Sequence, residues 1–312
     1  MAPPHGAWSG PAQGAELDSL LGHCTFVPAG AALCCAVSGG ADSLALLALA
    51  VAAGCDVTAV HVDHGLRSGS AAEAEVVAAA AALLGARFRS VRVEVGAGPN
   101  LEARARAARR AALPAGSATG HTMDDQAETV FVNLLRGAGV DGLAGIRLGP
   151  EHPLLGLRRS QTHALCQALG LDPVRDPSNT DGRFVRNRVR HELLPLACDI
   201  AGRDLVPLLA RQAAVLADEA DLLDALAAGI DPTEARALGT APAPLARRAT
   251  RRWLRGDAPY PPDLAAVERV LAVARGEMVA TDVAPGRRVR RSRGSLSSQP
   301  VAPEASGSVG AR

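Results

Sequence analysis

Apolar positions in the first 140 residues alternate between two spacings. Short apolar or every-second-residue runs predict strands at residues 31–37, 57–62, 91–95 and, weakly, 117–119. Longer segments with apolar residues three and four apart predict helices at residues 44–53, 73–84, 101–113 and 126–136. Strands that alternate with helices of this length are typical of a parallel sheet with helices on both faces. The pattern therefore predicts an α/β domain with a doubly wound parallel sheet.

The strand pattern stops after Asp199, which indicates a change of architecture. Residues 205–226, 243–254 and 263–274 are predicted to be helices, separated by glycine, proline and aspartate. The predicted organisation is a flexible tail at residues 1–20, an α/β domain at 21–202, a smaller all-helical domain at 203–290 and a disordered basic tail at 291–312.

The composition of the 312-residue chain excludes several classes of protein. All 33 basic residues are arginine, so a Walker-type phosphate loop and a Schiff-base enzyme, which each need a lysine, are impossible. Aromatic residues make up 2% of the chain, which disfavours RNA binding by stacked aromatic side chains. The six cysteines show no C-x-x-C spacing, which disfavours structural zinc or an iron–sulfur cluster.

No targeting or membrane segment is expected. The first arginine is Arg67, so the N-terminus lacks the positive charge of secretory, twin-arginine and mitochondrial signals. The longest apolar runs, residues 44–53 and 76–84, are roughly half of the ~20 residues that a membrane span requires. We therefore expect a cytoplasmic protein without a membrane partner.

The near-neutral net charge of +1 conceals three clusters of arginine, at residues 183–190, 247–255 and 287–293. Clustered arginines are expected in a protein that binds a polyanion such as RNA. Solvated helix faces are the alternative for each cluster taken alone. The sequence leaves both interpretations open.

The residues Ser38-Gly39-Gly40-Ala41-Asp42-Ser43 lie between a predicted strand and a predicted helix, where doubly wound proteins bind phosphates. The glycines allow a sharp turn with converging amides, and the helix N-terminus adds partial positive charge. Asp42 would repel a bare phosphate, so its presence points to a divalent cation between the carboxylate and the phosphates. An ordinary strand-to-helix turn with a Ser/Asp cap is the alternative.

Four further sequence blocks follow this loop in order. They are residues 61–67 (HVDHGLR), 100–106 (NLEARAR), 121–137 (HTMDDQAET running on to LLRG) and 176–188 (DPSN with FVRNR). Together with S-G-G-A-D-S they resemble the N-type ATP pyrophosphatases, the PP-loop family, and within it the tRNA(Ile)-lysidine synthetases. The resemblance covers roughly residues 30–200 and implies that residues 21–202 form a Rossmann-like PP-loop ATPase domain, the catalytic domain. It also implies that the helical domain at 203–290 binds tRNA.

The resemblance implies an ATP-dependent RNA-modifying ligase. In that family, ATP with Mg²⁺ adenylates the C2 oxygen of the wobble cytidine (position 34) in the CAU anticodon of tRNA(Ile), and pyrophosphate leaves. The ε-amine of free L-lysine then displaces AMP, which gives lysidine and AUA decoding. ATP and Mg²⁺ are thus the expected cofactors, and tRNA(Ile) and L-lysine the expected partners.

The resemblance also implies roles for individual residues. Asp42 and Asp125 would hold Mg²⁺ near the α-phosphate, and Arg106 would assist catalysis. The ATP-binding candidates are Ser38, Gly39, Gly40, Ala41, Asp42, Ser43 and Val62. The candidates for binding tRNA or lysine are Asp176, Asn179, Arg186, Arg188 and Arg190, with Arg251 added from the cluster at 247–255. By spacing alone, Asp125 and Glu128 also fit a helix capping box.

Three other functions fit the sequence less well. Residues 137–142 match G-x-G-x-x-G letter for letter, but they follow a predicted helix instead of a strand, so we reject NAD binding. A PP-loop tRNA thiolase is an alternative, although the missing C-x-x-C pairs argue against it. A non-catalytic nucleotide- or RNA-binding module is another, although Asp42 and Asp125 argue against it.

Overall fold

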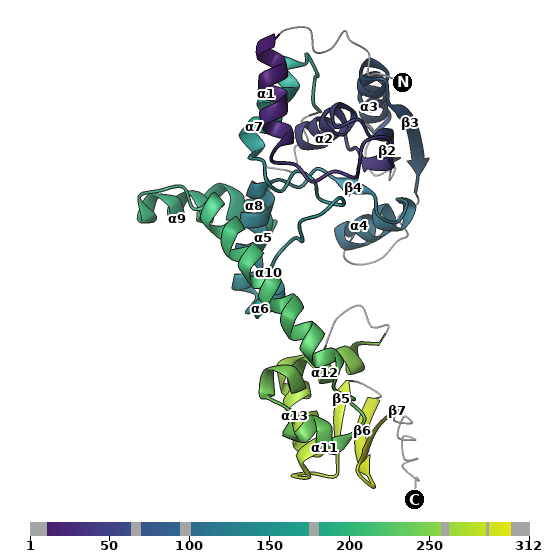
Figure 1. Ribbon diagram of the computed structural model, residues 1–312, viewed down its shortest axis with the longest axis vertical. Coiled ribbons are helices and arrows are strands. Elements are labelled where there is room, and N and C mark those ends of the chain that lie inside the picture. Colours follow the sequence, from purple (N-terminus) through teal and green to yellow (C-terminus); the bar gives the residue numbers. More distant parts are fainter. Residues whose placement is uncertain are drawn as a thin grey trace, which may run out of the picture. The chain divides into compact units, whose positions relative to one another are not determined.

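The protein forms two compact units. The computed structural model describes residues 11–63, 70–93, 101–174, 181–256, 262–284 and 287–300. The first unit is Met1–Ala217 and the second is Asp218–Arg312, and Figure 1 shows both. The division falls inside helix α10 (Val206–Ala228), whereas the sequence predicted a boundary at residue 202.

A four-stranded parallel sheet forms the centre of the first unit, as the alternating pattern predicted. Its order is β3 (Arg87–Arg92), β2 (Asp56–Asp63), β1 (Ala32–Ala36) and β4 (Ala118–Thr119). At the end of β1, Ala36 pairs with Val60 on one side and with Thr119 on the other. The carboxyl ends of these strands therefore meet at one edge, where α/β proteins bind their ligands.

Strand β3 begins at Arg87, four residues before the predicted strand at 91–95. It lies at the edge of the sheet, and most of its residues are exposed. Because the strand is exposed, arginines occupy positions that are apolar in a buried strand. The apolar pattern therefore did not predict where the strand begins.

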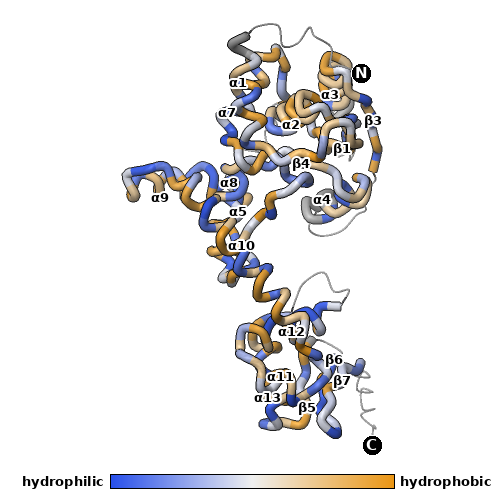
Figure 2. The backbone as a smooth tube through the Cα atoms, viewed as in Figure 1, coloured by the Kyte–Doolittle hydropathy of each residue, from blue (hydrophilic) through white to orange (hydrophobic). Residues whose placement is uncertain are grey.

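Each strand of this sheet is followed by a helix. These helices are α2 (Ala41–Ala52), α3 (Ser70–Leu84), α4 (Leu101–Ala112) and α5 (Met123–Leu135). Helix α2 is apolar along its length after Asp42 and Ser43 (Figure 2), and its leucines 44, 46, 47 and 49 are completely buried. Helix α7 (Arg159–Ala168) packs against it. The loop that precedes α2 is therefore attached to the most buried helix of the unit.

Helix α1 (Pro11–Leu21) lies within the predicted flexible tail, so that part of the prediction is wrong. Leu20 is buried, and Leu17 and Leu21 pack against the same core. These leucines stand three and four residues apart, on one face of the helix. The helical spacing of these three leucines is short and lies among glycines, alanines and prolines, so the sequence analysis did not predict the helix.

Along the chain, several short helices lie between the last strand of this sheet and α10. They are α6 (Val140–Leu143), α8 (Val185–Arg188), the π-helical turn η2 (Val189–Leu193) and α9 (Leu194–Ala201). π-helical turns are rare and frequently occur at functional sites. In the part of the chain that the structure describes, no helix is long and apolar enough to cross a membrane.

The second unit contains a small antiparallel sheet, so the prediction of an all-helical domain is wrong. Helices α11 (Ala235–Thr240), α12 (Ala243–Arg255) and α13 (Leu264–Arg275) are followed by β5 (Ala280–Ala284), β6 (Arg287–Ser292) and β7 (Ser295–Pro300). The strand order is β5-β6-β7. The core joins Val267, Val270 and Leu271 of α13 to Val289 and Leu296 of the sheet. The predicted disordered tail is wrong for residues 291–300, and residues 301–312 lie outside the described part.

Candidate active site

The loop between β1 and α2 offers free backbone amides. Gly39 has a φ of +85°, a left-handed conformation that glycine adopts without strain. The hydroxyl of Ser43 donates to the Gly40 carbonyl oxygen at 2.8 Å and accepts from the Ser38 amide at 3.1 Å, which closes the loop. Among the described residues, the amides of Gly39 and Gly40 have no hydrogen-bond partner. They are therefore available to an anion at the start of α2.

Asp42 lies in the first turn of α2 and is contacted from α7 on both carboxylate oxygens. Thr162 donates its hydroxyl to one oxygen, and Nε of Arg159 lies 3.4 Å from the other. Burial raises the pKa of Asp42, against the opposing effects of the Thr162 hydrogen bond and the Arg159 charge. A Cβ atom at Gly120 would lie 2.6 Å from the Asp42 carbonyl oxygen. Glycine at position 120 therefore lets the backbone approach Asp42 closely.

Helix α5 begins with a capping box that differs from the predicted one. Thr122 is the N-cap residue, and its amide and hydroxyl donate to the Asp125 carboxylate at 2.9 and 2.8 Å. The predicted box between Asp125 and Glu128 is wrong, because Asp125 is the third residue of the helix and closes the box with Thr122. The Glu128 side chain is completely buried within the protein. The observed box fixes one oxygen of Asp125 and leaves the other for side chains from elsewhere in the chain.

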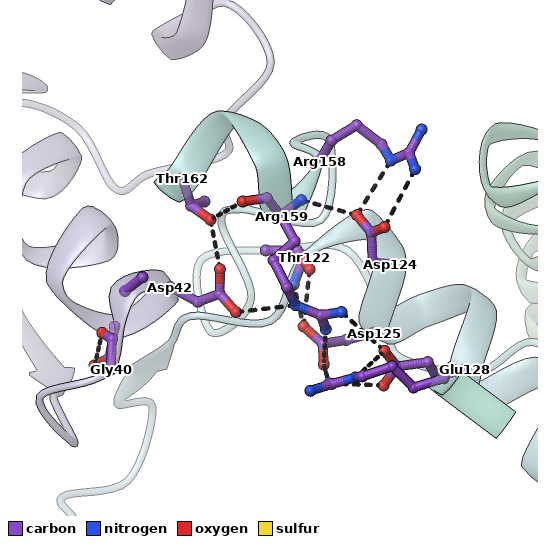
Figure 3. A network of polar contacts seen from close by, with 12 residues as sticks. Gly40, Asp42, Thr122, Asp124, Asp125, Glu128, Arg158, Arg159 and Thr162 are labelled. Atoms are coloured by element: carbon purple, nitrogen blue, oxygen red, sulfur yellow. Dashed lines mark hydrogen bonds and ion pairs between the residues drawn. The ribbon is translucent and has the colours of Figure 1, made fainter. Parts of the chain in front are cut away.

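Three arginines converge on Asp125 and Glu128. Arg159 donates to both carboxylates at 3.0 Å, and Figure 3 shows how it links them to Asp42. Arg186 of α8 contacts Asp125 at 2.9 Å and Glu128 at 3.0 Å. Arg190 of η2 donates to the two oxygens of Glu128 at 2.6 and 3.0 Å. We call these six side chains, including Asp42, the carboxylate–arginine cluster.

The formal charges of the carboxylate–arginine cluster cancel, since three guanidinium groups face three carboxylates. Burial alone would raise the pKa of Asp125, but Arg159 and Arg186 lower it to about 2. Burial likewise opposes the charge on Arg159, yet Asp125 and Glu128 raise its pKa. Asp125 and Arg159 are therefore both ionised at neutral pH and hold each other in place.

Asp124 anchors the start of α7. It accepts hydrogen bonds from Nε of Arg158 at 3.1 Å and from the amide of Arg159 at 2.8 Å. Burial raises the pKa of Asp124, but these hydrogen bonds outweigh it and the pKa is lowered. Arg158 also pairs with Asp204. These contacts fix the position from which Arg159 reaches the cluster.

Two cavities lie beside the cluster. The first has a volume of about 1300 Å³, and its lining includes Ser38, Asp42, Asp125, Arg159 and Arg190. The second has a volume of about 1050 Å³ and shares His121 with the first. Its lining is basic and includes Arg110, Arg136, Arg147, Arg183 and Arg186.

The structure brings together many of the predicted site residues. The loop at 38–43, Asp125 and Arg190 line the first cavity or border it, and Arg186 lines the second. Val62 is buried near the end of β2. Arg188 is exposed and pairs with Glu192 at 2.8 Å instead of joining the cluster.

Other predicted residues lie elsewhere or outside the described part of the chain. Arg251 belongs to α12 in the second unit. Arg106 lies on α4, but its side chain is outside the described residues, as are Asp176 and Asn179.

Sequence reasoning missed Arg159 and Thr162, and it assigned Glu128 to a helix cap alone. Arg159 lies 117 residues from Asp42 and 34 from Asp125. No local pattern distinguishes this arginine from the chain's others. The folded contact between α2, α5 and α7 is what makes it a site residue.

Comparisons with known proteins show which family the chain belongs to. A PP-loop domain matches residues 15–197. The tRNA(Ile)-lysidine synthase of Nocardia farcinica is 45% identical over 265 residues, which cover 79% of this chain and 83% of that protein. The enzyme of the same name from Mycolicibacterium paratuberculosis is 47% identical over 238 residues, covering 71% and 73%.

A solved structure supports the fold alone. The U34-tRNA thiolase NcsA from Methanococcus maripaludis, determined with its 4Fe-4S cluster, superimposes with a TM-score of 0.51 at 17% identity. The match covers 65% of this chain and 76% of the thiolase. From the PP-loop match and the extensive identity to its curated relatives, we conclude that this chain belongs to the tRNA(Ile)-lysidine synthase family.

Proposed function

We propose that this chain is an ATP-dependent ligase that attaches L-lysine to C2 of the wobble cytidine (position 34) in the CAU anticodon of tRNA(Ile). The observation that carries the proposal is the loop at 38–43, with the available amides of Gly39 and Gly40, beside the carboxylate–arginine cluster in a chain of the lysidine synthase family. The product is lysidine, which makes the anticodon read AUA.

The loop at 38–43 fits the pyrophosphate part of ATP. Its free amides and the N-terminus of α2 supply hydrogen bonds and partial positive charge without a lysine. The backbone at Val62, near the carboxyl end of the neighbouring strand, would then face the adenine.

The charges around the loop favour Mg²⁺ as a partner of ATP. Because the carboxylate–arginine cluster is neutral, a bound polyphosphate brings negative charge that the cluster does not balance. Asp42 is the residue best suited to hold the ion, since it lines the first cavity and its single arginine contact is long, at 3.4 Å. When bound, Mg²⁺ would neutralise charge on the departing pyrophosphate.

Asp125 fits the predicted metal role less directly. One of its oxygens accepts two hydrogen bonds from Thr122, and the other accepts from Arg159 and Arg186. Asp125 therefore positions arginines in this structure. It would reach a metal ion if those guanidinium groups moved onto the phosphates.

The reaction needs no covalent bond to the protein. The C2 oxygen of the cytidine attacks the α-phosphorus, the bond to the bridging oxygen breaks, and pyrophosphate leaves. The lysine ε-amine then attacks C2, the C2–O bond breaks, AMP leaves, and the amine proton passes to solvent. Arg159 and Arg190 line the cavity and would bind the anionic groups.

The second cavity fits the anticodon loop. Its arginines are of the kind that contact RNA phosphates, and through His121 it shares a wall with the cavity at Asp42. The roles of Arg106 in catalysis and of Asp176, Asn179, Arg188 and Arg251 in binding lysine or tRNA stay predictions.

No observation favours the thiolase alternative. Burial raises the pKa of Cys24, Cys35 and Cys166 to about 12, so these thiols are neutral at physiological pH. Sulfur transfer by a protein thiol requires a reactive thiolate.

The test is incorporation of radiolabelled lysine into tRNA. Purified protein with Mg-ATP should label tRNA(Ile) bearing CAU, leave initiator methionine tRNA unlabelled, and release pyrophosphate. The Asp42→Asn variant should not incorporate label. Pyrophosphate release without lysine transfer would support the ATP site but contradict lysine as the substrate. If ATP is not consumed at all, the proposed function is wrong.

A further inference from the structure

His152 lies against the carboxyl edge of the central sheet in the first unit. The Thr119 amide donates to the carbonyl oxygen of Glu151, the residue before His152, at 2.9 Å. Thr119 is the last residue of β4, and it pairs with Ala36 at the end of β1. The backbone beside His152 is therefore fixed at the edge of the sheet from which the loop at 38–43 begins.

Within the described part of the chain, the Thr119 hydroxyl oxygen has three partners. It lies 2.8 Å from Nδ1 of His152, 2.7 Å from Nδ1 of His121 and 3.2 Å from the Glu151 carbonyl oxygen. A hydroxyl has one proton to donate, and a carbonyl oxygen can only accept. All three contacts are therefore satisfied together when the hydroxyl donates to the carbonyl and both histidines donate from Nδ1.

This arrangement sets the tautomer of His152. A neutral imidazole that donates from Nδ1 has no proton on Nε2, so Nε2 is an acceptor. Burial lowers the pKa of His152, although the charge of Glu151 opposes this effect, so the neutral ring is favoured at physiological pH. Among the described residues, Nε2 of His152 has no hydrogen-bond partner. The fold therefore offers an acceptor at this position.

The acceptor lies close to the wall that the two cavities share. The His152 ring packs edge-on against His121, with the ring centres 5.1 Å apart. His121 lines both cavities, and His152 lines the second. Among the residues that the structure describes, five arginines line the second cavity, and a guanidinium group can donate hydrogen bonds but cannot accept them. His152 therefore adds an uncharged acceptor to a lining rich in donors.

The proposed reaction brings the wobble cytidine to this wall. The phosphates around it fit the arginines of the second cavity, while its C2 oxygen must reach the α-phosphate of ATP in the first. The base must therefore pass the two histidine rings. Cytosine carries an amino group at C4, which donates a hydrogen bond, whereas uracil carries an oxygen there, which accepts one. An acceptor beside the wall can thus distinguish the two bases.

We infer that Nε2 of His152 accepts a hydrogen bond from the amino group of the wobble cytidine and so selects cytidine over uridine. Thr119 is a positioning residue, because its hydroxyl holds the ring in the tautomer that accepts. In the other tautomer Nε2 would donate and would favour the uracil oxygen. The inference rests on the proposed function, which brings this cytidine into the site.

The test uses two versions of tRNA(Ile). One carries cytidine at position 34, and the other carries the ribonucleoside of pyrimidin-2-one, which lacks the amino group but retains the C2 oxygen. The readout is the transfer of labelled AMP from ATP to each tRNA, expressed as the ratio of the kcat/KM value for cytidine to that for pyrimidin-2-one. The intrinsic difference in reactivity between the two bases cancels when this ratio is compared between variants.

H152N and H152Q are a matched pair of variants. The asparagine amide can replace Nδ1 as the donor to Thr119 but does not reach the position of Nε2, whereas the glutamine side-chain oxygen can occupy that position. The ratio should fall about tenfold in H152N, which corresponds to the loss of one hydrogen bond, and should stay near the parental value in H152Q. T119V should also lower the ratio, and T119S, which retains the hydroxyl, should restore it.

A parental ratio in both H152N and T119V would overturn the inference. So would equal losses of activity on both tRNAs in H152N and H152Q, because such losses indicate a structural role for the ring. If the parent protein transfers no AMP to the cytidine tRNA, the proposed function fails and the inference fails with it. Parental transfer with an unchanged ratio in the variants rejects the role of His152 alone.

Discussion

Replacing Asp125 with asparagine tests whether the carboxylate–arginine cluster stabilises the first unit. The Asp125 side chain is 10% exposed and faces Arg159 and Arg186 at 3.0 and 2.9 Å. Its pKa of about 2, against an ordinary 3.8, corresponds to about 2 kcal/mol of stability at pH 7. We expect D125N to lose about that much in free energy of unfolding, as measured by urea titration followed by circular dichroism.

The same shift predicts how the effect depends on pH. Because the folded-state pKa is lower than the unfolded value, the contribution is complete above pH 4 and disappears as the pH falls toward 2. Roughly half should be gone at pH 3, so the difference between the parent protein and D125N should be halved there and should close as the pH approaches 2. D181N is a matched control, since Asp181 forms an exposed pair with Arg183 and its replacement should have no measurable effect. Equal stability of D125N and the parent at pH 7 would refute the reasoning.

Three further substitutions probe the site. D42N should lose ATP-dependent AMP release but melt no lower than the parent. Burial raises the pKa of Asp42, so the ionised carboxylate destabilises the fold at pH values above its ordinary pKa. A clear drop in melting temperature would contradict this. G120A should reduce AMP release at least tenfold, because its Cβ would lie 2.6 Å from the Asp42 carbonyl oxygen, whereas G139A, with open space at its Cβ, should leave the rate unchanged. E128Q should lower the free energy of unfolding by about 3–5 kcal/mol in urea titration, since it removes a buried carboxylate from three arginines; a loss below about 1 kcal/mol would count against the network.

The glycine-containing loop at 38–43 was predictable because its signals are local. A strand, two glycines and an apolar helix follow one another within residues 31–53, and the structure has β1, the left-handed Gly39 and α2 in that order. The carboxylates Asp42 and Asp125 were predictable for the same reason, since each lies at the start of a helix that follows a strand.

Features that depend on distant contacts were not predictable. Arg159 became a site residue through the packing of α7 against α2, and nothing in its neighbourhood in the sequence indicates that. The sheet of the second unit escaped because its strands bury few large apolar side chains, chiefly Val283, Val289 and Leu296, among arginines and serines. Arginine clusters also look alike in sequence whether their partners lie within the protein, as for Arg247 with Glu268, or outside it.

The most direct test of the proposed function follows the two halves of the reaction on one tRNA. ATP labelled in its α-phosphate is incubated with the protein and tRNA(Ile) bearing CAU, first without lysine and then with it. We expect AMP label to accumulate on the tRNA without lysine, and added lysine to release it as free AMP while one lysine is retained for each AMP released. Label that never reaches the tRNA, or that stays there when lysine is added, would contradict it.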